Sequence, residues 1–216
     1  MNRERTSGIL LIAGALAGVV VMALHPTAHG VMAPGSGASV GHLNRMVHGL
    51  AIAAAPVVFF GLVGLGRRLG PGDLTTAALV ACGFGATAIL GAAIASGFVA
   101  TEVIEWVRDG EGLAREDGHL LLDYTSLWNQ AFAKVYAAAM SAGILLWSAA
   151  IVSTGRMARS IGYAGIAIGA AALLGILSGH VRMSIHGFGA IVVLHAVWMV
   201  AVGIALISVS SGTRPA

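Results

Sequence analysis

Six long apolar stretches constrain this chain more than any other feature of its sequence. A helix needs about 20 apolar residues to cross a bilayer, and six segments approach or exceed that length: 8–24, 47–65, 74–100, 126–151, 161–179 and 187–209. Only 10% of the residues are charged, whereas a soluble domain carries about 25%. We therefore predict an all-α polytopic membrane protein whose residues 1–216 form one six-helix integral membrane domain.

The arginines predict how this bundle is oriented. If the N-terminus is cytoplasmic, seven arginines fall on cytoplasmic segments and four on the opposite side. Short connections rich in Lys and Arg tend to stay in the cytoplasm. We therefore predict that both termini are cytoplasmic, that the membrane is a cell inner membrane, and that the longer outer loops, 25–46 and 101–125, face the periplasm.

On this topology, all eight histidines lie at or near helix ends on the periplasmic face: His25, His29, His42, His48, His119, His180, His186 and His195. Neutral imidazole is the commonest metal ligand. A polar ring well inside an apolar run, as at His195, is costly unless it is paired or functional. We predict that His48, His180 and His195 address the bundle interior. For any one of them, the alternative is a hydrogen bond to a carbonyl or hydroxyl of a neighbouring helix.

Carboxylates add to this set. Glu102 and Glu105 share a face if the third helix continues past Ala100, and Glu102 is the closer one to the core. Histidine with carboxylate suits Zn²⁺, Mn²⁺, Fe, Ni²⁺ or Co²⁺. We predict a metal site made of His48, His180, His195 and Glu102.

Three further polar residues are predicted to support this site: Gln130, Lys134 and Glu105. Gln130 and Lys134 lie on a polar stripe of the fourth apolar segment. A lysine at that depth is expected to pair or to extend toward the membrane surface. We expect Lys134 to pair with Glu102, and Asp123 is the other candidate partner.

Three functions fit these patterns. The first is a membrane protein that binds a transition-metal ion of unknown identity for uptake, delivery or homeostasis. The second is a b-type haem protein for electron transfer, or a haem-bearing anchor subunit, with axial ligands from His48, His180 and His195. The third is a non-catalytic helical subunit of a larger membrane complex. No phosphate-binding loop or nucleophile motif is present, so the sequence favours binding over catalysis.

Composition also limits the partners. The 31 glycines include pairs four residues apart, such as Gly14 with Gly18 and Gly165 with Gly169, which allow helix backbones to approach closely. We expect these faces to pack inside the bundle, although a homo-oligomer or larger complex would use the same faces. Lipid is the remaining partner, because the basic residues are too scattered to predict nucleic-acid binding. The single cysteine, Cys82, excludes an internal disulfide.

Overall fold

The fold is known from a computed structural model that describes residues 3–26, 38–109 and 115–212. In these ranges every regular element is a helix. They are α1 (Arg3–Leu24), α3 (Ala38–Leu69), α4 (Asp73–Ile94), the π-helical turn η1 (Ala95–Val99), α5 (Ala100–Asp109), α6 (Arg115–Thr154), α7 (Arg159–Leu177) and α8 (Ile185–Gly212). The described residues contain six helical segments that are long and apolar enough to cross a membrane, which confirms the predicted all-α, six-span fold.

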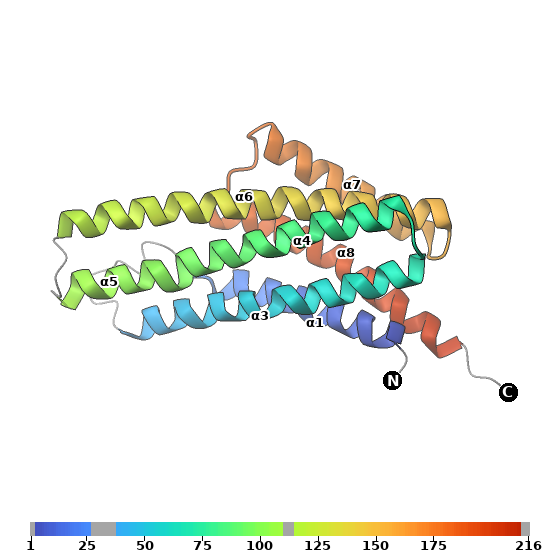
Figure 1. Cartoon of the computed structure of the whole chain (residues 1–216), viewed down its shortest axis with the longest axis horizontal. Coiled ribbons are helices and arrows are strands. Elements are labelled where there is room, and N and C mark those ends of the chain that lie inside the picture. The colour runs from blue at the N-terminus through green and yellow to red at the C-terminus, as the bar shows by residue number, and fades with distance from the viewer. Residues whose placement is uncertain (1–2, 27–37, 110–114, 213–216) are drawn as a thin grey trace.

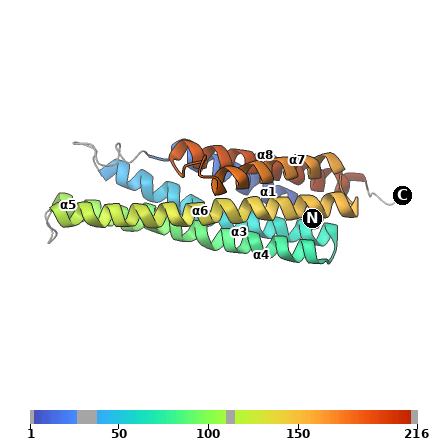
Figure 2. The same ribbon diagram turned by 90° about the horizontal axis from the view of Figure 1, so that it is seen from above.

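The helices form one elongated bundle. α1 packs against α3 and α8, α6 packs against α4 and α7, and α3 lies beside α4 (Figures 1 and 2). The start of α1 and the end of α8 lie at the same end of the bundle, which we call the termini end (Figure 1). α5 and the start of α6 mark the opposite end, which we call the histidine end because α1 runs toward it and stops just before His25.

Several helices extend beyond the predicted spans. α6 has 40 residues, so it is about 60 Å long, roughly twice the thickness of a hydrocarbon core. Parts of the predicted loops 25–46 and 101–125 are helical, because α3 already begins at Ala38 and η1 joins α4 to α5 without a break. α5 is an amphipathic helix whose polar face is used for ion pairs with α3. α5 and the start of α6 therefore form a hairpin that projects past the apolar spans.

The termini half of the bundle is tightly packed. Leu11, Leu62, Leu65, Ile144 and Trp147 are all at most 1% exposed. A Cβ atom at Gly14 would lie 2.5 Å from Val58 Cγ2, and one at Gly165 would lie 2.2 Å from Trp198 Nε1. These predicted small-residue positions thus let α1, α3, α6, α7 and α8 approach inside the bundle.

Candidate functional site

His48 is buried where α3 meets the π-helical turn. Its Nδ1 lies 2.8 Å from the carbonyl oxygen of Asn44, one turn earlier in α3. A carbonyl can only accept a hydrogen bond, so Nδ1 carries the ring proton and Nε2 keeps its lone pair. Gly97 makes this close approach possible, since a Cβ atom there would lie 2.2 Å from His48 Cβ.

The side chain of Asn44 fixes α3 to the same turn. Its Nδ2 donates to the carbonyl oxygen of Ser96 and to Thr101 Oγ1, both at 2.9 Å. Asn44 is only 5% exposed, so these bonds satisfy a buried amide. π-helical turns are rare and frequently occur at functional sites. Here the turn provides an acceptor for Asn44 and the glycine against His48.

His25 meets His48 from the end of α1. The two rings are edge to face, with centroids 4.8 Å apart and an interplanar angle of 69°. His25 Nδ1 lies 3.0 Å from the carbonyl oxygen of Pro26, so this ring also carries its proton on Nδ1 and its lone pair on Nε2. Burial lowers the pKa of His25, against a smaller opposing effect of the Pro26 bond, and therefore favours the neutral ring.

Three adjoining cavities run from the histidine end into the bundle. The outermost, which we call the vestibule, has a volume of about 460 Å³ and is lined by His25, His119, Asp123, Asn129 and Gln130, among others. The next, the waist, has about 90 Å³ and is lined by both His25 and His48. The deepest, the inner cavity, has about 70 Å³ and contains His195 in its wall.

Shared wall residues connect these cavities in series. His25 and Asn129 line both the vestibule and the waist. Ala51 and Ile89 line both the waist and the inner cavity. The His25–His48 pair therefore lies between a polar outer space and a mostly apolar inner one.

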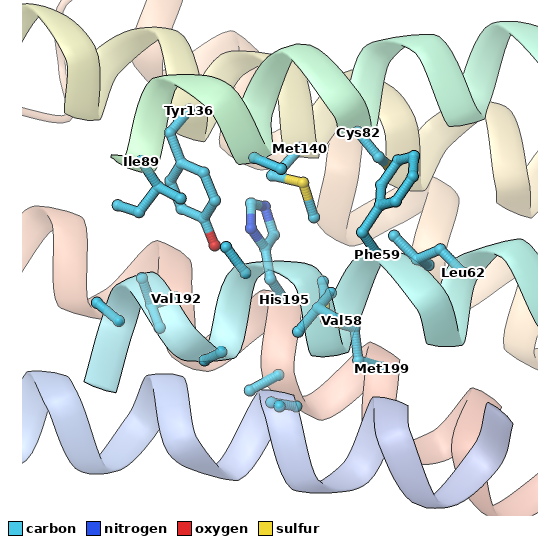
Figure 3. A pocket seen from close by; sticks show the side chains of 17 residues that line it. Val58, Phe59, Leu62, Cys82, Ile89, Tyr136, Met140, Val192, His195 and Met199 are labelled. Atoms are coloured by element: carbon cyan, nitrogen blue, oxygen red, sulfur yellow. The ribbon is translucent and has the colours of Figure 1, made fainter. Parts of the chain in front are cut away.

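His195 points into the inner cavity, as Figure 3 shows. Its Nε2 lies 3.0 Å from Ser141 Oγ, which also donates to the carbonyl oxygen of Ala137 at 2.7 Å. A serine hydroxyl has one proton, so His195 Nε2 must donate to Ser141. His195 Nδ1 is then the nitrogen with the lone pair, and it is buried without a hydrogen-bond partner.

The four predicted ligands do not meet. His48 and His195 are both buried, but they line different cavities. His180 is exposed and hydrogen-bonded to Ser178 Oγ at 2.8 Å. Glu102 is half exposed and paired with Arg45. In residues 3–26, 38–109 and 115–212, no three His, Cys, Asp or Glu side chains gather closely enough to hold a metal ion.

Local structure explains the positions of the two predicted ligands that lie away from the cavities. α7 ends at Leu177, and Gly179 follows with φ +76°, a left-handed conformation that glycine adopts without strain. This turn leaves His180 outside the bundle. Glu102 has a closer partner than any histidine, because Arg45 on α3 reaches both Glu102 at 3.3 Å and Glu105 at 2.9 Å.

The predicted pair between Lys134 and Glu102 does not form either. Lys134 is exposed and lies with Gln130, Gly179 and Arg182 around a shallow cavity beside the end of α7. This is a different face of α6 from the one that α5 contacts. Gln130 also lines the vestibule, whereas Glu105 serves the ion pair with Arg45.

His25 lines a cavity, although it is not among the three histidines that the sequence predicts for the bundle interior. Pro26 does end α1 at Leu24, but the turn brings the His25 ring back over α3 instead of directing it outward. The sequence feature that could have predicted this position is the place of His25 directly after the first apolar stretch, 8–24. His29, another member of the histidine set, lies outside the described residues.

Comparisons with models of protein families, with curated proteins and with solved structures found no match for this chain.

Proposed function

We propose that this protein binds a transition-metal ion at the His25–His48 pair and serves in the uptake, delivery or homeostasis of that metal. One observation carries the proposal. Two imidazoles from different segments line one cavity, and each uses its Nδ1 proton on a backbone carbonyl. Metal-bound histidines typically have this second-shell bond, which leaves Nε2 for the ion.

The separation of the two rings supports the same proposal. Two imidazoles on one tetrahedral ion, with metal–nitrogen bonds of about 2.0–2.1 Å, have ring centres roughly 5 Å apart. The observed separation between the His25 and His48 rings is 4.8 Å. The separation of the two rings is therefore compatible with a shared ion.

Other donors in the waist indicate which metals would fit. Met22, Met183, Asn129 and Ser184 line the cavity with the two histidines. Thioether sulfur favours copper in its monovalent state, and imidazole suits copper, zinc and nickel. The absence of a carboxylate from the described wall of the waist argues against hard ions such as Mg²⁺ or Mn²⁺.

The haem alternative has less support from this geometry. Pockets for cofactor-sized ligands typically have volumes of about 300–1,000 Å³. The waist and the inner cavity have about 90 and 70 Å³, and His180 lies outside both. His48 and His195 thus border space for an ion or a few waters.

We propose the same orientation as the charge pattern predicts, with both termini in the cytoplasm and the vestibule open to the periplasm of an inner membrane. Arg67 and Arg68 in the last turn of α3 support it, because they lie at the termini end. Asp123 and His119 line the opposite, vestibule side. A metal ion would then approach from the periplasm through a polar space.

Equilibrium dialysis of the purified full-length protein against Cu²⁺ tests the proposal. The double variant His25→Ala/His48→Ala should lose one bound ion per chain relative to the unaltered protein. The control variant, His42→Ala/His186→Ala, removes two exposed histidines and should keep that ion. Equal binding by both variants, or no binding by the unaltered protein, would rule the site out and leave a role as a subunit of a larger complex.

A further inference from the structure

The inner cavity contains a buried nitrogen that the fold leaves without a partner. His195 is 1% exposed, and its Nδ1 has no hydrogen-bond partner. Because Ser141 fixes the proton on Nε2, Nδ1 presents a lone pair to the cavity. A buried acceptor that has no partner among the described residues is unfavourable, which favours a ligand at this position.

Two methionine side chains line the same cavity as that nitrogen. Met140 on α6 and Met199 on α8 both line the inner cavity with His195. His195 and Met199 are four residues apart, which places them on one face of α8. Figure 3 shows the sulfur of Met140 beside the His195 ring, with the hydroxyl of Tyr136 on the other side. The donors thus come from two helices that the fold brings together.

The charge of the cavity narrows the class of ligand. Among the described residues, the wall of the inner cavity contains no Asp, Glu, Lys or Arg. A divalent ion would bring two uncompensated charges into the apolar interior, which is expensive. A monovalent copper ion carries half that charge, and it prefers soft thioether and imidazole donors. Its size also suits a cavity of about 70 Å³.

We propose that the inner cavity is a second metal site, for a monovalent copper ion bound by His195 Nδ1 and the sulfur atoms of Met140 and Met199. All three ligands are neutral and none loses a proton on binding. The ion arrives as Cu⁺, so the site requires no electron transfer. This inference rests on the proposed function in one respect, since the ion reaches the inner cavity by passing the His25–His48 pair.

The two sites form a sequence along the bundle axis. The waist and the inner cavity share Ala51 and Ile89 in their walls, so an ion leaving the waist would pass these two apolar side chains. The inner site then acts as the deeper of two successive binding positions. Such an arrangement favours passage of an ion into the bundle over simple storage at its surface.

Titration of the purified full-length protein with Cu⁺, in competition with a chromogenic Cu⁺ chelator, tests the proposal. The unaltered protein should bind two ions per chain. Met140→Leu removes the sulfur with little change in volume and should leave one ion, as should His195→Ala. The control is Met157→Leu, which alters a buried methionine outside the cavity and should keep two.

The variants separate this inference from the function on which it rests. If His25→Ala/His48→Ala binds one ion and Met140→Leu binds two, the waist site stands and the inner site is excluded. If the double variant still binds two ions and Met140→Leu binds one, the inner site stands and the waist site fails. X-ray absorption of the copper-loaded double variant should show sulfur neighbours. A copper environment of nitrogen and oxygen alone would overturn the inner site.

The variant Ser141→Ala tests whether His195 carries its ring proton on Nε2. Ser141→Ala removes the acceptor that holds the proton on His195 Nε2, and loss of such a second-shell partner weakens metal binding by about 10–100-fold. Ser148→Ala is the matched control, because Ser148 is equally buried on α6 and lies outside the cavity. Equal Cu⁺ affinities of the two variants would contradict the proposed coordination.

Discussion

The two halves of the bundle differ in how closely their helices pack. At the termini end, glycine positions bring backbones together and large apolar side chains fill the remaining space. Toward the histidine end, the helices separate around a vestibule and a waist. The inner cavity, which Gly14 and Leu62 line together with His195, lies where the two halves meet. Large buried side chains in the termini half thus contact apolar neighbours, whereas buried histidines toward the other end border cavities.

The largest change in the free energy of unfolding is expected at the centre of the termini half. Trp147 is completely buried in the main apolar cluster, so Trp147→Ala should lower the free energy of unfolding by about 3–5 kcal/mol. Reversible unfolding in mixed detergent measures this change. Trp106→Ala is the control, because Trp106 is 42% exposed and should matter little. Equal losses from the two variants would remove the contrast between the halves.

Glycines test the contrast at two matched positions. A Cβ at Gly165 meets Ser148 Oγ and Trp198, whereas a Cβ at Gly49 meets nothing within 4 Å. Gly165→Ala should cost about 1–3 kcal/mol through overpacking. Gly49→Ala, toward the histidine end, should instead stabilise α3 by about 0.5–1 kcal/mol. The same unfolding measurement decides this, and destabilisation by Gly49→Ala would show that the histidine half is packed as tightly as the other.

In the histidine half of the bundle, the side chain of Asn44 links α3 to η1 and α5. Asn44→Ala removes two hydrogen bonds, one to η1 and one to α5, and should cost about 1–3 kcal/mol at 0.5–1.5 kcal/mol for each bond. It should also weaken metal binding at the waist, because η1 positions His48 through Gly97. Unfolding and Cu²⁺ dialysis on the same sample measure both effects. Unchanged metal affinity would show that these hydrogen bonds of Asn44 do not influence the waist site.

The smallest change in the free energy of unfolding is expected for the ion pairs of Arg45. Arg45 pairs with Glu102 and Glu105 where these side chains are 34%, 51% and 26% exposed. Exposed ion pairs contribute about 0.2–1 kcal/mol, so Arg45→Gln should change the free energy of unfolding by no more than that and should lose its effect at high salt. A loss above this range would mean that the ion pairs hold the hairpin of α5 and α6 in place.

Sequence alone predicted the number of spans because each has a long apolar run. It did not predict where the helices end. Apolar length reports the part of a helix in lipid, whereas α5 and the start of α6 continue as helix through polar residues. The reach of these helices depends on partners such as Arg45 on α3, which no local pattern reveals.

The candidate site was predictable only in part, for a similar reason. Burial of His48 and His195 follows from their place in apolar runs. Their separation into two cavities depends on helix rotation and on the glycine at position 97. The outward position of His180 depends on the turn at Gly179, and the inward position of His25 on the turn at Pro26. Such turns decide which histidines meet.

The central claim is that His25 and His48 together hold a metal ion. Electron paramagnetic resonance of the protein loaded with Cu²⁺ tests it most directly, because imidazole nitrogens split the copper signal. In the unaltered protein, we expect the copper signal to show splitting from two nitrogens. This splitting should be lost in His25→Ala/His48→Ala and kept in His42→Ala/His186→Ala. An unchanged spectrum in the first of these variants would contradict it.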